Sequence, residues 1–185
     1  MIDRTITSRS GQTLTVRRLA GRDVNALQSF HQELSPETRS RFTPHAYEDA
    51  IIAVYVRRNE QGKDLIYVLE TGDREIVGYF FLWEFKDPVP LLGIGLADAM
   101  QGEGLGKTMM EILIAEAQAA GCDGIELTTF PDNERAFRLY LSVGFNEIGM
   151  VENITGDGRK VIERKMFLPL KEGAKPTERE FKPPA

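Results

Sequence analysis

The residues best suited to chemistry lie in the segment Gln-Gly-Glu-Gly-Leu-Gly-Lys at 101–107, where three glycines alternate with other residues. A strand-like apolar run precedes this segment, and a stretch with helical spacing follows it. Glycines let the main chain turn tightly with its N–H groups directed inward, and a following helix adds the positive end of its dipole. The segment therefore predicts a cradle for phosphate oxygens.

Three phosphate-binding patterns can be compared with this segment. A P-loop, Gly-x-x-x-x-Gly-Lys-Ser/Thr, fits Gly106-Lys107-Thr108 but has Gln101 where its first glycine belongs. The dinucleotide fingerprint Gly-x-Gly-x-x-Gly fails, because the glycines stand at every second position. The pattern Gln/Arg-x-x-Gly-x-Gly/Ala matches at Gln101, Gly104 and Gly106. We interpret the segment by this third pattern, and an ordinary strand-to-helix turn is the alternative that involves no ligand.

A second motif, Asn-x-x-Ala-x-x-Leu-Tyr-x-x-x-Gly-Phe, follows at 133–145. With the glycine loop at this distance before it, the chain resembles the GCN-five-related N-acetyltransferase (GNAT) superfamily, whose later motif it matches at every named position. The resemblance covers about 91–145 through these motifs, and the order of elements extends it over 14–168. It implies an α/β fold with a mixed, mostly antiparallel sheet, one splayed parallel strand pair and flanking helices.

The resemblance also implies that acetyl-CoA is the acyl-donor cosubstrate, held between strands that end near Leu96 and Phe130. Backbone groups at 96–98 would bind the pantetheine arm and polarise the thioester carbonyl, and backbone N–H groups at 101–107 would bind the pyrophosphate. Asn133 would bond an amide of the arm, and Ala136 would leave room for it. The implied cofactor-binding residues are Leu96, Ala97, Asp98, Gln101, Gly102, Glu103, Gly104, Leu105, Gly106, Lys107, Asn133, Ala136 and Tyr140.

Direct attack of a primary amine on the thioester within a ternary complex needs no acyl-enzyme. The tetrahedral oxyanion would be stabilised by backbone donors, and Tyr140 would be the catalytic residue that donates a proton to the departing thiolate. The alternative without catalysis is that Asn133 only caps its helix and Tyr140 only packs.

The general base is left open by the sequence. Some members of the superfamily carry a carboxylate on the strand before the phosphate loop, but 91–97 contains none, and the first carboxylate is Asp98. Glu33, Glu84 and Glu126 are the other candidates, and a water relay is equally possible.

The resemblance implies that the acceptor is a primary amine of a small molecule, an amino-acid derivative or a protein lysine. The N-terminal half, with Arg17 and the Leu-Ser-Pro-Glu-Thr-Arg-Ser-Arg-Phe segment at 34–42, is similar to the GNAT domains of bacterial protein-lysine acetyltransferases. We expect an acyl-CoA-dependent N-acyltransferase. The alternatives are a GNAT-fold regulatory module that binds CoA without turnover and a nucleotide hydrolase.

Composition and charge limit the domain organisation, the compartment and the partners that we expect. The 185 residues, 42% hydrophobic and 28% charged, fit one domain at 1–170 with a mobile or surface-draped tail at 171–185. One cysteine, Cys122, and two histidines, His31 and His45, predict neither a disulfide nor a metal site and fit a reducing cytoplasm. A net charge of −5 argues against nucleic acid as a partner.

The N-terminal residues lack the apolar core of a signal peptide, and no apolar run approaches a membrane span. We therefore expect a cytoplasmic protein without a membrane partner, and a possible homodimer formed through a sheet edge or the C-terminal strands.

The elements that must position these residues follow from periodicity and turn signals. Predicted strands cover 2–8, 13–19, 65–70, 76–84, 90–96, 125–130, 145–151 and 160–168. Helices are predicted from 21, from Ser35-Pro36 through 42, and over 47–58, 108–120 and 133–143. A turn is predicted at 153–158.

Overall fold

The chain folds around one mixed sheet. A computed structural model describes residues 3–184, and its strands run in the order β1-β2-β3-β4-β5-β6-β8-β7. Neighbouring strands are antiparallel except for β5 and β6, which are parallel. The predicted fold class, a mostly antiparallel sheet with one parallel pair and flanking helices, is confirmed.

The strands lie close to their predicted positions: β1 (Arg4–Thr7), β2 (Thr13–Arg18), β3 (Leu65–Glu70), β4 (Ile76–Trp83), β5 (Leu91–Leu96), β6 (Gly124–Thr129), β7 (Asn146–Ile154) and β8 (Lys160–Pro169). The turn predicted at 153–158 begins too early, because β7 continues to Ile154, which pairs with Lys160. Ile2, the first residue of the first predicted strand, lies outside the described residues.

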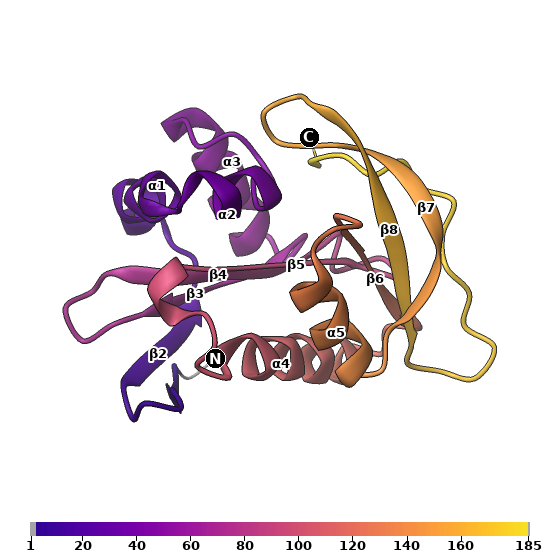
Figure 1. Ribbon diagram of the computed structural model, residues 1–185, viewed down its shortest axis with the longest axis horizontal. Coiled ribbons are helices and arrows are strands. Elements are labelled where there is room, and N and C mark those ends of the chain that lie inside the picture. Colours follow the sequence, from indigo (N-terminus) through magenta and orange to yellow (C-terminus); the bar gives the residue numbers. More distant parts are fainter. Residues whose placement is uncertain (1–2, 185) are drawn as a thin grey trace.

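Helices cover both faces of the sheet. Helices α1 (Val24–Glu33), α2 (Pro36–Arg41) and α3 (Asp49–Glu60) lie on one face, and α4 (Leu105–Ala119) and α5 (Glu134–Ser142) lie on the other (Figure 1). The predicted cap of α2 is confirmed, since the Ser35 hydroxyl accepts the Thr38 N–H. None of the described helices has the length and apolar composition that a membrane span needs.

Strand β4 is buried along its whole length and supplies both cores. Phe80 and Leu82 pack toward α4, with Met109 and Leu113. Tyr79, Phe81 and Trp83 point to the other face and pack with residues of α1 and α3. Because successive strand residues face opposite sides, one continuous apolar strand can serve two helical layers.

Helix α4 begins at Leu105, earlier than the predicted residue 108. Gly104 is the N-cap and has a φ of 80°, the left-handed region in which glycine carries no steric penalty. The helix therefore continues through Gly106 and Lys107, although glycine is a poor helix former. Only 101–104 is loop, and Leu105 to Lys107 form the first helical turn.

Strands β5 and β6 separate soon after they meet. Leu91 and Glu126 are their paired residues in register, and the rest of β5 has no partner on β6. On its other side β5 pairs with β4 along its length. The parallel pair is therefore splayed, as the family resemblance implied.

The C-terminal tail lies against the sheet in this structure. It runs beside β8 and β7 and ends near α3 (Figure 1). Thr177 donates its N–H and its hydroxyl to the fully buried carboxylate of Glu126, and Arg179 approaches the same carboxylate at 3.4 Å. Phe181 is buried, and its carbonyl accepts the N–H of Ile154. Mobility of 171–185 stays a prediction, and Ala185 lies outside the described residues.

His45 is expected to make the stability of the fold depend on pH. Its side chain is 1% exposed, Nδ1 faces the Ala46 carbonyl, and Nε2 lies 2.9 Å from the Tyr79 hydroxyl. Burial lowers the pKa of His45 from 6.5 to about 4. The unfolded chain therefore takes up the proton first, so the stabilisation is complete above about pH 6.5 and is lost as the pH falls to about 4.

The expected loss over this window is roughly 3 kcal/mol of unfolding free energy. A His45→Gln variant, which stays neutral, is expected to be less stable at neutral pH but to lose less stability on acidification. Urea denaturation of both proteins at several pH values measures this. Parallel pH profiles for the two proteins would show that His45 is not the cause.

Candidate active site

A cavity of about 570 Å³ opens between the splayed strands. One end is lined by the glycine loop and α5, and the other by α2, β4, β5, the end of β7 and the tail. Of the predicted site residues, ten line it together: Leu96, Asp98, Gln101, Gly102, Gly104, Gly106, Lys107, Asn133, Ala136 and Tyr140. Ala97, Glu103 and Leu105 do not line it.

The glycine loop presents open main chain to the cavity. Gly102 and Gly104 have φ values of 86° and 80°, and a Cβ added to Gly104 would meet no atom within 4 Å. The N–H groups of Leu105, Gly106 and Lys107 belong to the first turn of α4 and so have no helical carbonyl to bond. With the helix dipole, this arrangement suits an anion.

The loop is fixed from behind by the β1–β2 hairpin. The Arg9 guanidinium donates to the Gly102 carbonyl, the Arg9 N–H donates to the Glu103 carbonyl, and the Ser10 N–H donates to the Glu103 carboxylate. Glu103 therefore faces the hairpin, away from the cavity. Leu105 is 1% exposed and belongs to the core beneath α4. Both residues support the loop, and only their backbone N–H groups remain in the predicted binding role.

At the end of β5, some backbone N–H and C=O groups bond β4 and others point toward the cavity. The Ala97 N–H donates to the Val77 carbonyl at 2.9 Å, so it is already used. Hydrogen-bonded and non-hydrogen-bonded pairs alternate along an antiparallel ladder. The next pair, Leu96 with Gly78, is therefore non-hydrogen-bonded. The backbone groups of Leu96 point away from β4, toward the side on which β6 has already separated from β5. Leu96 is thus the backbone donor best placed to meet a ligand.

Asp98 is a structural contact with α2. Its carboxylate accepts hydrogen bonds from the Ser35 N–H, the Ser35 hydroxyl and the Thr38 hydroxyl. Burial alone would raise the pKa of Asp98, but these hydrogen bonds outweigh it and the net shift is downward. Asp98 is therefore held ionised and engaged, which makes it a poor candidate for the base.

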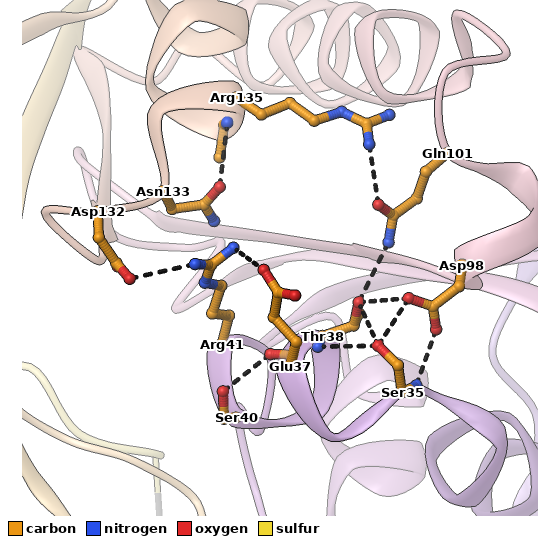
Figure 2. A network of polar contacts seen from close by, with 11 residues as sticks. Ser35, Glu37, Thr38, Ser40, Arg41, Asp98, Gln101, Asp132, Asn133 and Arg135 are labelled. Atoms are coloured by element: carbon orange, nitrogen blue, oxygen red, sulfur yellow. Dashed lines mark hydrogen bonds and ion pairs between the residues drawn. The ribbon is translucent and has the colours of Figure 1, made fainter.

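Polar contacts join α2 to both sides of the cavity (Figure 2). The Gln101 amide accepts from Arg135 at 3.0 Å and approaches the Thr38 hydroxyl at 3.4 Å. At the other end of α2, Arg41 bonds Asp132 at 3.1 Å. These contacts position α2 relative to the glycine loop and to α5.

Helix α5 turns one face to the cavity. The Asn133 side-chain oxygen caps the helix by accepting the Ala136 N–H at 3.3 Å, and its Nδ2 has no hydrogen-bond partner among the described residues. Asn133, Ala136 and Tyr140 all line the cavity, as predicted for residues on one helical face. The Tyr140 side chain is buried, and its hydroxyl also has no partner within residues 3–184. Burial, and then the charge of Glu163, raise the pKa of the Tyr140 phenol well above its ordinary value.

The other predicted base candidates lie away from the cavity. Glu33 is exposed on α1. Glu84 bonds Arg58 at 2.8 Å. Glu126 lies beneath the tail, where it pairs with Lys165 at 3.1 Å. None of the three lines the cavity.

Three charged residues that the sequence did not single out do line it: Glu163 on β8, Arg135 on α5 and Lys182 in the tail. Arg135 occupies a variable position of the later motif, and its guanidinium lies 3.8 Å from where a Cβ of Gly102 would be. Glu163 stands in the run Glu-Arg-Lys, whose charges show no alternation. The only sequence signal for Glu163 would have been a single carboxylate on the inward face of a strand. Because Arg164 and Lys165 follow it directly, the charged and apolar positions do not alternate and this signal is lost.

Metal-ligand clusters are absent from the described residues: no three His, Cys, Asp or Glu side chains come together. Cys122 is buried at the end of α4, and burial raises the pKa of its thiol. It packs as a small residue in the core beneath α4.

Comparison of the sequence with known proteins identifies a family and individual relatives. Residues 27–145 match the family model for the acetyltransferase (GNAT) family. The [ribosomal protein bS18]-alanine N-acetyltransferase of Haemophilus ducreyi is 30% identical over 95 residues, which make up 51% of this chain and 66% of that protein. The chain thus spans slightly less than two thirds of the length of this curated relative.

Solved structures share the fold. The ribosomal-protein-S5-alanine acetyltransferase from Vibrio fischeri aligns with a TM-score of 0.77 at 12% identity, over 95% of this chain and 100% of that one. The GNAT domain of S. lividans PAT aligns with a TM-score of 0.75 at 18% identity, over 91% and 97% of the two chains. With the family match over 27–145, the glycine loop and the splayed strands have a common explanation: the chain belongs to the GNAT family of acetyltransferases.

Proposed function

We propose that the protein is an N-acetyltransferase that moves an acetyl group from acetyl-CoA to a primary amine within a ternary complex. The observation that carries the proposal is the single cavity in which the glycine loop and Tyr140 open onto the gap between β5 and β6. A donor that binds along this gap presents its phosphates to the loop and its thioester to Tyr140.

The donor site is built from backbone groups and one helix face. The N–H groups of the first turn of α4 would take the pyrophosphate, with Lys107 and Arg135 adding positive charge at the same end of the cavity. The free Nδ2 of Asn133 would donate to an amide carbonyl of the pantetheine arm. Ala136 leaves space for that arm, and the Leu96 backbone would polarise the thioester carbonyl.

Tyr140 would donate the proton that the departing thiolate needs. A phenol with a raised pKa keeps its proton across the neutral range, so it is available as an acid. Its hydroxyl has no hydrogen-bond partner among the described residues and is free to meet the sulfur. Because the amine itself attacks the thioester, transfer of the acetyl group from CoA requires no nucleophilic side chain of the protein.

Isothermal calorimetry distinguishes this proposal from a nucleotide hydrolase. Acetyl-CoA is expected to bind without added metal, and ATP with magnesium is expected to bind weakly or not at all. Tight binding of ATP with magnesium and no binding of acetyl-CoA would contradict the proposal. A regulatory module that binds CoA without turnover would pass this test, and measurement of turnover separates it.

The conformation of the phosphate loop gives a further expected result. Gly104→Ala places a Cβ in the open space where the donor phosphates would approach, at a φ of 80°. We expect stability to fall by about 1 kcal/mol and the affinity for acetyl-CoA to fall about five- to tenfold, measured by calorimetry.

Gly121→Ala is the matched control for this variant. Gly121 has a φ of 77° and equally open surroundings at the other end of α4, outside the cavity. It should lose similar stability and keep its affinity for acetyl-CoA. Equal affinity losses in the two variants would mean that the loop does not contact the donor.

A further inference from the structure

The acceptor end of the cavity contains a buried carboxylate that the donor site does not use. Glu163 on β8 is 5% exposed and lines the cavity. Its Oε2 accepts a hydrogen bond from Nδ2 of Asn153, a residue of the adjacent strand β7. The same amide nitrogen lies 3.3 Å from the Thr128 hydroxyl of β6. Three strands thus hold this carboxylate in one position.

No cation pairs with Glu163 among the described residues. Lys165, two residues along the same strand face, is paired with Glu126, and Arg164 lies on the opposite face, where it stacks on Phe137. Buried carboxylates are normally paired with a positive charge. An unpaired one in a cavity is therefore suited to a cationic ligand. Tyr140 is close enough for the charge of Glu163 to act on its phenol.

The other acidic side chains that line the cavity are already engaged. Glu37 bonds Arg41 at 2.8 Å. Asp98 accepts its three hydrogen bonds from Ser35 and Thr38. The remaining charged residues of the acceptor end, Arg41 and Lys182, are in ion pairs of their own, Arg41 with Glu37 and Asp132 and Lys182 with Glu180. Among the described residues, the acceptor end thus offers one unengaged carboxylate for an ammonium group and no second one for another cation.

The rest of this end is apolar. Phe42, Phe81, Trp83 and Leu91 contribute to its walls. A Cβ on Gly93 or Gly95 would meet the Phe81 or Phe42 ring at 2.3 Å, so these glycines let the two rings lie against β5. A short uncharged group next to the amine would fit this surface.

We propose that Glu163 binds the acceptor ammonium and takes its proton, and that the acceptor is a monoamine with a short uncharged group next to its nitrogen, as at the α-amine of a peptide or an amino acid derivative. This inference rests on the proposed function. The ammonium gives one proton to the Glu163 carboxylate, and the free nitrogen forms a bond to the thioester carbonyl carbon. The carbon–sulfur bond then breaks, and the sulfur takes the Tyr140 proton. The nitrogen loses its second proton to solvent as the amide forms. Glu163 then releases its proton to solvent and Tyr140 regains one from solvent, so one proton is released for each amide formed.

The test compares Glu163→Gln, Glu163→Asp and Glu152→Gln with the wild-type protein. Glu152 lies opposite Ile162 on the same strand pair, so its side chain is on the other face of the sheet and is a matched control. Release of free thiol from acetyl-CoA is measured with propylamine, glycinamide, a short peptide with a free α-amine, and spermidine. Calorimetry with acetyl-CoA checks in each variant that the donor site is intact.

Glu163→Gln is expected to bind acetyl-CoA normally and to lose about a hundredfold or more of the transfer rate near neutral pH. The loss should shrink at high pH, where the amine gives up its proton without help. Glu163→Asp should retain part of the rate, and Glu152→Gln all of it. Spermidine should be at least about tenfold poorer than the monoamines, because its additional charges find no unengaged carboxylate among the described residues of the acceptor end and meet its apolar walls.

Two results would overturn the inference alone: wild-type turnover that is unchanged in Glu163→Gln, or spermidine as the best acceptor. Release of thiol by the wild-type protein that no amine of the panel increases would overturn the proposed function and this inference together. The peptide and the small amines distinguish a macromolecular acceptor from a free one.

Discussion

A Tyr140→Phe variant is expected to transfer acetyl groups about a hundredfold to a thousandfold more slowly than the wild-type protein, with nearly unchanged affinity for acetyl-CoA. The substitution removes only the hydroxyl, which has no hydrogen-bond partner among the described residues, and leaves the ring in its buried position beside Phe145. Folding and donor binding should therefore survive. The departing thiolate would lose its proton donor, so the effect should fall on kcat.

Tyr67→Phe is the matched control for this experiment. The Tyr67 ring is also buried, but its hydroxyl bonds Glu116 on α4, and the residue does not line the cavity. Steady-state kinetics and calorimetry on both variants separate chemistry from binding. Equal rates for Tyr140→Phe and the wild type would remove Tyr140 as the acid, whereas a matching loss of donor affinity would assign it a packing role.

The second large effect is expected in stability, from Glu126→Ala. The Glu126 carboxylate is fully buried, and it holds Lys165, Thr177 and Arg179 at one point beneath the tail. Removing it leaves Lys165 buried without its partner. Loss of one member of a buried ion pair typically costs about 3–5 kcal/mol, and we expect a loss of roughly 3 kcal/mol in unfolding free energy by urea denaturation.

Asp123→Ala provides the comparison for this pair. Its carboxylate bonds Lys171 at 2.7 Å, but both side chains are about half exposed, so the change should cost less than about 1 kcal/mol. Limited proteolysis gives a second readout, because cleavage within 171–184 should become faster only in Glu126→Ala. Similar stability losses in the two variants would mean that the buried network does not anchor the tail.

The donor side of the site could be predicted from the sequence because its residues are close together in the chain. Gln101, Gly104 and Gly106 in one segment, and Asn133, Ala136 and Tyr140 on one helix, line the cavity as their spacing indicates. The start of α4 was misplaced, since Gly104 as N-cap lets the helix include Gly106. Local spacing carries information about a loop and a helix, but it does not reveal which N–H groups are already engaged, as at Ala97.

The acceptor side could not be predicted, because it is assembled from distant segments. Glu163 meets Asn153 and Thr128 only after β6, β8 and β7 pair, and its neighbours Arg164 and Lys165 obscure the strand alternation. Glu126 carried a clearer signal. A carboxylate between Ile125 and Leu127 in a buried strand requires a partner, and Lys165 of β8 and Arg179 of the tail supply it.

The central claim is tested most directly by measuring free thiol released from acetyl-CoA with and without an amine, together with the mass of the amine product. We predict release that depends on the amine, with one acetylated amine formed for each thiol released. Binding of acetyl-CoA without amine-dependent release over the whole amine panel would contradict the claim, and would instead assign the protein to the regulatory modules that hold CoA without turnover.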